Sequence, residues 1–415
     1  MQRYANARDA VDDLRPDVPV YGFRPAVLKQ DAQRFLKAFP GRTAYAVKTN
    51  GEQFLLDCLA EAGIEAFDVA SPAEFAAART AKRDAELLYM HPVKAQSDIR
   101  LALEDYRIRA IALDHEDEVA KVLRIVRALD IDPATITVFV RLATKGHAAY
   151  ELSKKFGAAP GHAAELVQRI SNIGFQTGLC FHVGSQVADI ESYRDALGVA
   201  AQVRKDAGVE LAALDIGGGF PAPYRDEGNR RSAIPEIETM MRRILKAVDA
   251  AGFSDVPLIA EPGRVIVARC LSVIVRVLLR KGRRIYINDG IWSSLSDSWT
   301  GKITLPARFL PDPARKRRHG KDELVPFRVC GATCDSVDIL SRPFHLPDTI
   351  DTGDWIEIGH IGAYSLSLRS RFNGFYPDTF VEIETPFEEP PGERGYATIE
   401  TMGDSPQDLP EFDRS

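Results

Sequence analysis

The chain has 415 residues, of which 45% are hydrophobic and 27% charged, and its formal net charge is −6. This length allows two domains with a large core, and the composition is that of a soluble globular protein. The negative balance argues against a nucleic-acid surface, and no run is long and apolar enough to cross a bilayer. We therefore expect neither nucleic acid nor a membrane as a partner.

The N-terminus and the cysteines bear on the compartment. The first residues lack an apolar signal core, which predicts a cytoplasmic location. The five cysteines are an odd count, which favours free thiols over a disulfide framework. Their spacing does not suggest a structural metal site.

Short apolar segments recur along the first two thirds of the chain and predict eight strands. They cover residues 44–47, 66–69, 87–90, 108–113, 137–140, 177–181, 211–216 and 257–260. Amphipathic helical patterns lie between most of them, for example over 116–129 and 190–205. Alternation of strand and helix implies parallel pairing, and eight such units match the usual size of a closed barrel. We predict an α/β fold with a (β/α)8 TIM barrel over residues 24–268.

Polar residues and glycines stand where these strands end. They are Lys48, Asp68, His91, Asp114, Arg141, His182, Gly217 and Glu261. Active sites of such barrels lie at the C-terminal ends of the strands. A lone lysine at a strand end is usually just solvated. An amine, carboxylates, a histidine and a glycine-rich anion loop at one end of a barrel are what a pyridoxal phosphate site requires.

The pattern of apolar residues changes after Arg264, where helical periodicity almost disappears. A β-branched run over 265–279 carries no helical stripe, and short strands are predicted at 284–288, 325–329, 355–358 and 380–383. We predict a mostly β C-terminal domain over 269–415, completed by an extended N-terminal arm over 1–23. Residues 306–321 look like an exposed basic loop without a function, and the tail from Thr385 is expected to be loosely held.

Seven motifs, in this order, carry a family resemblance: AVK (46–48), FDVAS (67–71), HVGS (182–185), DIGGGFP (215–221), EPGR (261–264), CDSVD (334–338) and GAYS (362–365). The chain resembles the fold-type III pyridoxal phosphate (PLP) decarboxylases of the ornithine/diaminopimelate group, and most of all ornithine decarboxylase. The resemblance implies PLP as cofactor and a homodimer whose active sites are shared between two subunits.

The resemblance also implies roles for residues of the barrel. Lys48 resembles the Schiff-base lysine, for which burial predicts a depressed pKa. Asp68 matches a carboxylate beside that lysine, although Asp68 and Ser71 could instead form a plain strand-end turn. Glu261 resembles the carboxylate that keeps the pyridine nitrogen protonated; the alternative is a salt bridge to Arg264. His182 resembles the imidazole stacked on the cofactor ring, and without the resemblance it would be an ordinary core histidine.

The phosphate would be bound by glycines and a few side chains. The triplet Gly217, Gly218 and Gly219 lets backbone amides approach an anion without side-chain clash. The matching family residues near the phosphate are Ser185, Gly263, Arg264 and Tyr364.

The CDSVD motif would act from the partner subunit. Cys334 resembles the acid that protonates the α-carbon after carbon dioxide leaves, and Asp335 would bind the distal ammonium of the substrate. The alternative for Cys334 is a buried cysteine in a turn. Asp338 and Lys155 match a family contact between subunits.

One segment departs from the ornithine decarboxylase pattern. The family has a second distal acid after its NDG motif, here residues 288–290, and that acid falls near Thr300 and Gly301. Asp297 would replace it if the loop shifts, and Trp292 stands at the family's aromatic position near the phosphate. Asp335, Trp292 and Asp297 are therefore the candidate substrate-binding residues.

The expected function is decarboxylation of a basic amino acid, foremost L-ornithine to putrescine and carbon dioxide. Lysine, diaminopimelate or another amino acid remains an alternative substrate. A non-catalytic regulatory relative is an alternative of another class, and retention of Lys48 and Cys334 argues against it. An alanine racemase is disfavoured by the CDSVD and FNGF (372–375) segments, and the chain shows no clustered ligands for a metal-dependent barrel enzyme.

Overall fold

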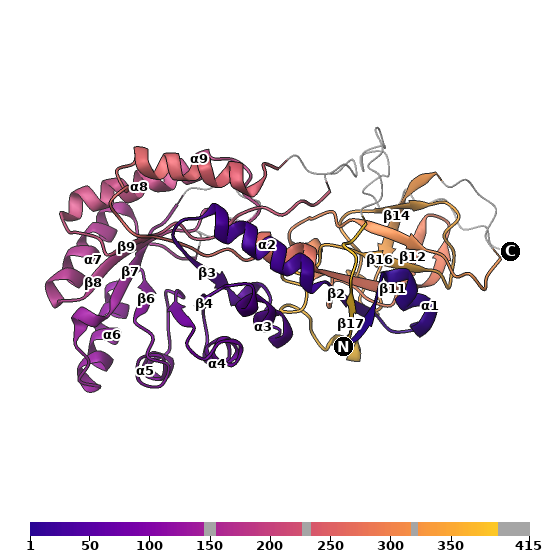
Figure 1. Cartoon of the computed structure of the whole chain (residues 1–415), viewed down its shortest axis with the longest axis horizontal. Helices are drawn as coiled ribbons and strands as arrows, with labels where there is room; N and C mark the ends of the chain where they lie inside the picture. Colours follow the sequence, from indigo (N-terminus) through magenta and orange to yellow (C-terminus); the bar gives the residue numbers. More distant parts are fainter. Residues whose placement is uncertain (145–154, 226–233, 317–322, 389–415) are drawn as a thin grey trace.

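The computed structural model describes residues 1–144, 155–225, 234–316 and 323–388. Figure 1 shows two bodies side by side: a ring of helices around strands, and a second body made mainly of sheet. No helix within the described ranges is long and apolar enough to cross a membrane. Part of the predicted basic loop (317–322) and most of the predicted loose tail (389–415) lie outside the described residues.

The first body is a closed barrel of eight parallel strands, which confirms the predicted fold. The strands are β3 (Arg42–Ala46), β4 (Ala66–Val69), β5 (Glu86–Tyr89), β6 (Ala110–Leu113), β7 (Thr137–Arg141), β8 (Gln176–Cys180), β9 (Ala213–Asp215) and β10 (Leu258–Ala260). β10 pairs with β3 and closes the ring. The surrounding helices are α2 (Pro25–Ala38), α3 (Gln53–Glu61), α4 (Pro72–Ala81), α5 (Gln96–Glu104), α6 (Glu116–Ala128), α7 (Pro160–Ile173), α8 (Glu191–Ala207) and α9 (Ile237–Ala250).

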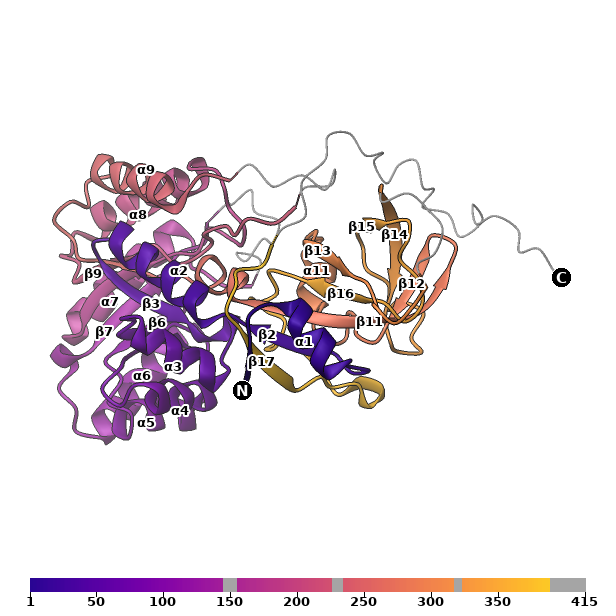
Figure 2. The ribbon, with the colours of Figure 1, turned by 45° about the vertical axis from the view of Figure 1, so that its right-hand side comes forward.

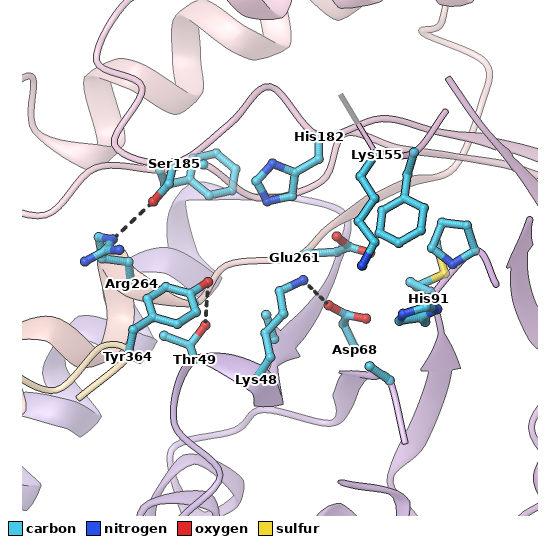
Figure 3. A pocket seen from close by; sticks show the side chains of 18 of the residues that line it. Lys48, Thr49, Asp68, His91, Lys155, His182, Ser185, Glu261, Arg264 and Tyr364 are labelled. Atoms are coloured by element: carbon cyan, nitrogen blue, oxygen red, sulfur yellow. Dashed lines mark hydrogen bonds and ion pairs between the residues drawn. The ribbon is translucent and has the colours of Figure 1, made fainter. Parts of the chain in front are cut away.

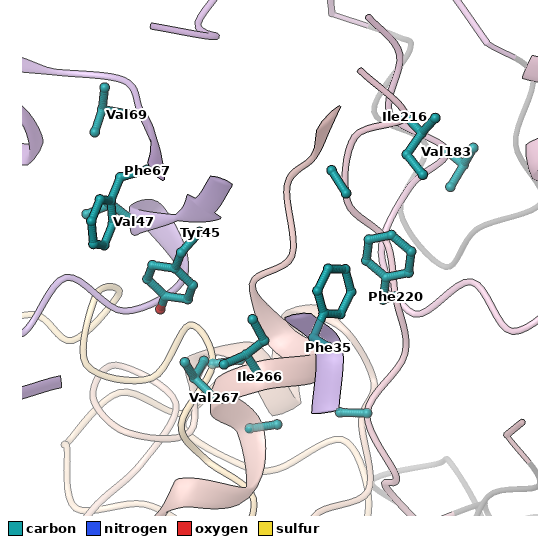
Figure 4. Packing of buried hydrophobic residues seen from close by; sticks show 14 of the residues in the cluster. Phe35, Tyr45, Val47, Phe67, Val69, Val183, Ile216, Phe220, Ile266 and Val267 are labelled. Atoms are coloured by element: carbon teal, nitrogen blue, oxygen red, sulfur yellow. The ribbon is translucent and has the colours of Figure 1, made fainter. Parts of the chain in front are cut away.

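Large apolar side chains pack between the barrel strands and the helices. Figure 4 shows this layer near the site, where Phe35 of α2 meets Phe220 edge-on with ring centroids 5.0 Å apart. The barrel interior holds smaller residues around Phe139. A Cβ at Gly178 would lie 2.5 Å from the Phe139 ring, so glycine is required there. This packing fixes the strand ends that carry the site.

The second body is one nine-stranded sheet. Its C-terminal members are β11 (Leu271–Lys281), β12 (Arg284–Ile287), β13 (Ala307–Leu310), β14 (Leu324–Cys330), β15 (Phe344–Pro347), β16 (Trp355–Ile358) and β17 (Thr379–Ile383). The N-terminus adds β1 (Gln2–Tyr4) beside β17, and β2 (Val20–Phe23) between β17 and β11. Figure 2 shows these indigo strands against the yellow and orange strands of the sheet.

Four segments differ from the sequence predictions. The N-terminal arm contains a helix, α1 (Ala7–Leu14), whose first turn is capped by the Asn6 side chain. The run predicted as strand over 265–279 begins with a helix, α10 (Arg264–Val267), and becomes strand only at β11. Core packing of Ile266 and Val267 overrides the weak helix propensity of β-branched residues. β13 occupies the start of the predicted basic loop, and β15 was not predicted.

A buried ionic cluster joins the start of the barrel to the sheet. Arg24 precedes α2 and donates to Glu357 of β16 over 2.6 Å, and the two side chains are 1% and 0% exposed. Glu357 also accepts hydrogen bonds from Ser272 and Arg308, at 2.8 and 2.7 Å. The carboxylate therefore balances two guanidinium groups where the two domains meet.

We expect Glu357→Gln to destabilise the protein strongly, because Arg24 would stay buried without its counter-charge. Breaking one half of a buried pair costs about 3–5 kcal/mol of unfolding free energy. Urea denaturation followed by circular dichroism measures the loss. Glu382→Gln, which removes the exposed partner of Arg3, is the control and should change the midpoint far less. Equal effects of the two substitutions would contradict the structural role of the cluster.

Candidate active site

A pocket opens where the barrel strands end and the sheet domain begins (Figure 3). Its walls include most of the residues singled out at strand ends: Lys48, Asp68, His91, Arg141, His182 and Glu261. Asp297 and Thr300 line it from α11 (Ser296–Thr300), and Tyr364 and Leu368 line it from the sheet domain. The fold thus brings the predicted amine, carboxylates and imidazole together.

Lys48 projects into this pocket beside Asp68. It follows β3 in a short 3-10 turn, Val47–Thr49, and its Nζ lies 3.2 Å from Asp68 Oδ2 (Figure 3). The charge of Asp68 raises the pKa of Lys48 above its ordinary value, and this effect outweighs the opposite effect of desolvation. The prediction that burial depresses the pKa of Lys48 is therefore wrong. A neutral nucleophilic amine needs a proton acceptor, and Asp68 is the nearest one.

Glu261 and Asp215 form a buried acidic pair behind the lysine. Burial, and next the charges of Asp215 and Asp68, raise the pKa of Glu261 well above its ordinary value. Burial also raises the pKa of Asp215 to about 7, although its Oδ1 accepts a hydrogen bond from the Gly217 amide at 2.7 Å. A carboxyl group in this setting is stabilised as an anion by a cationic partner, such as a protonated ring nitrogen.

His182 faces the pocket as a neutral imidazole. Burial, and then the charges of Lys48 and Arg141, lower its pKa well below the ordinary value. Its Nδ1 accepts a hydrogen bond from the Gly184 amide at 3.1 Å, which leaves the proton on Nε2. An uncharged, fixed ring of this kind suits stacking on an aromatic cofactor.

The three glycines after β9 occupy positions where a side chain of their own would collide with neighbouring backbone. A Cβ at Gly217 would lie 2.1 Å from the Phe181 carbonyl oxygen, and one at Gly218 would lie 2.6 Å from the Glu261 carbonyl oxygen. Gly217 and Gly219 also have positive φ, at +68° and +100°. Gly219 lines the pocket beside Ser185. This geometry fits the predicted phosphate cradle.

Arg264, Ser185 and Tyr364 meet on the same side. Arg264 Nε donates to Ser185 Oγ at 3.3 Å, and the guanidinium lies 4.9 Å from the centre of the Tyr364 ring. Gly263 is required beside them, since a Cβ there would lie 2.1 Å from Thr49 Oγ1. These residues present one cation and two hydroxyl groups, a donor set that suits a phosphate.

Asp297 holds Arg264 from the pocket wall. Its two oxygens accept from Nη1 and Nη2 of Arg264, at 2.5 and 3.1 Å. Arg264 therefore pairs with Asp297, and the predicted alternative of a Glu261–Arg264 salt bridge is not the arrangement found. Asp297 lines the pocket, and both of its oxygens are engaged by the arginine.

The remaining predicted residues lie away from this pocket within the chain. Cys334 is exposed, and its Sγ lies 3.3 Å from Asn373 Oδ1. The alternative of a buried cysteine is therefore wrong. Asp335 is half-buried, and its Oδ1 accepts a hydrogen bond from the Val337 amide. Trp292 packs against Trp299 and Phe372, and its ring centroid lies 6.2 and 5.7 Å from theirs. It does not line the pocket that contains Arg264 and Ser185.

The proposed partner contact of Asp338 and Lys155 is not formed within one chain. Asp338 is buried and accepts hydrogen bonds from the Ile291 and Thr333 amides at 2.9 and 3.0 Å, which fixes the loop before Cys334. Lys155 lines the barrel pocket. Within the described part of the chain, no three His, Cys, Asp or Glu side chains come together to hold a metal ion.

Two pocket residues received no role from the sequence. Arg141 is the last residue of β7 and His91 follows β5, so the strand-end pattern contained the signal. The sequence contained no signal for Lys94, which is buried behind the loop that carries His91. Its Nζ donates to the carbonyl oxygens of His91 and Pro92, both at 3.0 Å. The Lys94 amine therefore stabilises the conformation of the loop that carries His91.

Comparison with known proteins agrees with the geometry. Residues 26–268 match the family model described as "Pyridoxal-dependent decarboxylase, pyridoxal binding domain". A lysine/ornithine decarboxylase of Selenomonas ruminantium is 31% identical over 342 residues, covering 80% of this chain and 81% of the relative. Antizyme inhibitor 2 of Xenopus laevis is 30% identical over 402 residues, covering 89% of this chain and 83% of the relative.

A solved structure supports the same assignment. The lysine/ornithine decarboxylase of Vibrio vulnificus, complexed with putrescine, superposes with a TM-score of 0.74 at 27% identity. The match covers 91% of this chain and 96% of that one. The glycine cradle, the cationic and hydroxyl donors and the amine between carboxylates fit PLP as the cofactor. The chain belongs to the pyridoxal-dependent decarboxylase family.

Proposed function

We propose that this protein decarboxylates a basic amino acid, with L-ornithine as the preferred substrate and putrescine and carbon dioxide as products. The observation that carries the proposal is the Lys48 amine beside Asp68, in a pocket whose far wall buries Glu261. The names of the relatives, lysine/ornithine decarboxylases, support a substrate with a distal ammonium.

Bound in this pocket, PLP supplies an electron sink for the electron pair that remains when the carboxylate leaves as carbon dioxide. The chain's own residues bind and orient it. Lys48 would hold the cofactor covalently, and Asp68 would accept the proton of its amine. Glu261 would hold a proton on the ring nitrogen, and His182 would cover the ring face.

The phosphate would be bound by groups from both domains. Backbone amides of the loop 217–219, Ser185 and Arg264 would bind it from the barrel, and Tyr364 would donate from the sheet domain. Such charge-assisted bonds position the cofactor without taking part in bond breaking.

We propose that the protein acts as a homodimer in which each partner completes the other's site. Cys334 is exposed and Asp335 half-buried, and neither lines the pocket of its own chain. Large apolar side chains near them are also exposed: Trp299, Val337, Leu368, Phe372 and Phe375. Several exposed large apolar side chains on one domain favour a protein interface there.

In this arrangement the partner's Cys334 delivers the proton to the α-carbon. A thiol is suited to proton transfer near neutral pH. The partner's Asp335 binds the distal ammonium, because it stands next to the proton donor on the side where the substrate side chain must run.

Ornithine is the proposed preference, and lysine a second substrate. Thr300 lines the pocket near the position where ornithine decarboxylases have a second acid. One free acid grips the ammonium less firmly than two, and an extra methylene changes binding by only about 1–3 kcal/mol. Discrimination by chain length should therefore be weak.

A non-catalytic protein is the competing proposal, and the similarity to antizyme inhibitor 2 keeps it open. Retention of Lys48, Asp68, Glu261 and Cys334 favours the enzyme. Product analysis after incubation with PLP and a panel of amino acids separates the two proposals directly.

Lys48→Ala should abolish turnover and the visible absorbance of covalently bound cofactor, because no other amine takes its place. Borohydride reduction of the wild type followed by peptide mapping should label Lys48 alone. Lys155→Ala is the matched control in the same pocket and should still trap the cofactor. Labelling of any other lysine in the wild type would overturn the assignment.

Mixing Lys48→Ala with Cys334→Ala protein should restore activity, because each hybrid dimer contains one site without a substitution. Random exchange between equal amounts gives roughly a quarter of wild-type activity in a two-fold symmetric dimer. Each variant alone, treated in the same way, is the control. Absence of recovery after subunit exchange has been demonstrated by mass would refute the shared site.

Asp335→Asn should lower kcat/KM for ornithine and for lysine by roughly ten- to hundredfold, the usual worth of a hydrogen bond to a charged group. PLP affinity should stay unchanged. Asp195→Asn, on the exposed face of α8, should match the wild type in both measurements. Turnover of only neutral or acidic amino acids would show that the Thr300 departure marks a different substrate.

A further inference from the structure

The phosphate side of the pocket contains an internal anion. Arg264 is 5% exposed and Asp297 8%, so the ion pair between them is buried. Asp297 engages both terminal nitrogens of the guanidinium, at 2.5 and 3.1 Å. Tyr224 takes a further bond from Nη1 at 3.0 Å, and Ser185 takes the Nε bond at 3.3 Å.

This arrangement leaves Arg264 little capacity for another anion. A guanidinium has five N–H donors in a fixed plane, and all three of its nitrogens already have partners here. A phosphate that binds in a bidentate manner must displace at least one of these partners: Ser185 if it binds through Nε and Nη2, or Asp297 if it binds through Nη1 and Nη2. If the carboxylate stayed in place, two anions would share one buried cation, which low-dielectric surroundings make unfavourable.

We propose that Asp297 is a built-in competitor of the cofactor phosphate for Arg264. In the cofactor-free protein its carboxylate neutralises the buried arginine. On cofactor binding the phosphate takes over the guanidinium, and Asp297 gives up at least one of its two bonds. Asp297 therefore stabilises the cofactor-free protein and weakens its affinity for PLP.

The local structure allows such an exchange. Asp297 belongs to α11, a helix of only five residues whose Trp299 and Thr300 are exposed. Within the described residues, the hydrogen bonds found for the Asp297 carboxylate are those from Arg264. Arg264, in contrast, starts α10 in the core and keeps the Tyr364 ring against it, so the arginine is the fixed member of the pair.

The inference concerns uptake of the cofactor and does not depend on which amino acid is the substrate. It also separates the two parts of the cofactor. Pyridoxal has the same ring and aldehyde as PLP but no phosphate, so it reaches Lys48 without needing Arg264. Removal of Asp297 should therefore change the affinity for PLP and leave that for pyridoxal unaltered.

The test is a titration of cofactor-free full-length protein with PLP and, separately, with pyridoxal, followed by absorbance and tryptophan fluorescence. Asp297→Asn should bind PLP about tenfold more tightly or better, since hydrogen bonds between charged groups correspond to roughly ten- to hundredfold in affinity. Its affinity for pyridoxal should equal that of the wild type. Asp312→Asn is the control, because both Asp312 oxygens accept from Arg15 Nη2, at 2.7 and 2.8 Å, and Asp312 does not line the pocket.

Thermal unfolding gives a second readout. Cofactor-free Asp297→Asn should melt below the wild type, and saturating PLP should close that gap, because a ligand stabilises the state that it binds. If the asparagine variant does not fold, Asp297→Ser takes its place in both measurements. Unchanged or weaker PLP affinity in a folded variant, or an equal gain for pyridoxal, would overturn the proposal.

Discussion

The site depends on an imbalance of charge at one end of the barrel. Parallel strands end together, so Asp68, Asp215 and Glu261 are buried side by side, with the Lys48 amine between them and the solvent. Burial of three carboxyl groups is unfavourable unless cations or shared protons compensate them. A cofactor with a protonated ring nitrogen relieves this imbalance at Glu261, which couples binding of the ring to its electronic activation.

The phosphate end follows a different principle, because it draws on both domains. The barrel supplies the glycine loop and Ser185, while Tyr364 and α11 come from the sheet domain. Their relative position depends on the junction, where Arg24 and Glu357 form a buried pair. A fault at this junction would therefore displace the Tyr364 and α11 contacts before it disturbed Lys48 and Asp68, because β3, which leads to Lys48, pairs directly with β4, which carries Asp68.

Sequence patterns predicted the barrel and the strand-end residues, because period and position are local properties. They missed what depends on tertiary contacts. The β-branched run after Arg264 starts as a helix because the core packs it so, and the Lys48 pKa is raised because Asp68 happens to face the amine. The Arg264–Asp297 pair joins residues 33 positions apart in sequence. No spacing rule relates α10 to α11, so the sequence did not show that Asp297, a residue considered for the substrate, pairs with Arg264.

The placement of the CDSVD loop bears on specificity in the proposed dimer. The residues that fit the cofactor surround the barrel pocket, whereas the exposed Cys334 and the half-buried Asp335 lie in the sheet domain, on a loop fixed by Asp338. In the proposed dimer, the distance between the reacting carbon and the acid for the distal ammonium is set by the subunit interface rather than by the barrel. Small shifts of that interface would then select between diamino acids of different length, while the cofactor contacts stayed the same. Substrate preference in the proposed dimer would thus depend on the interface, and not on the residues that bind the cofactor.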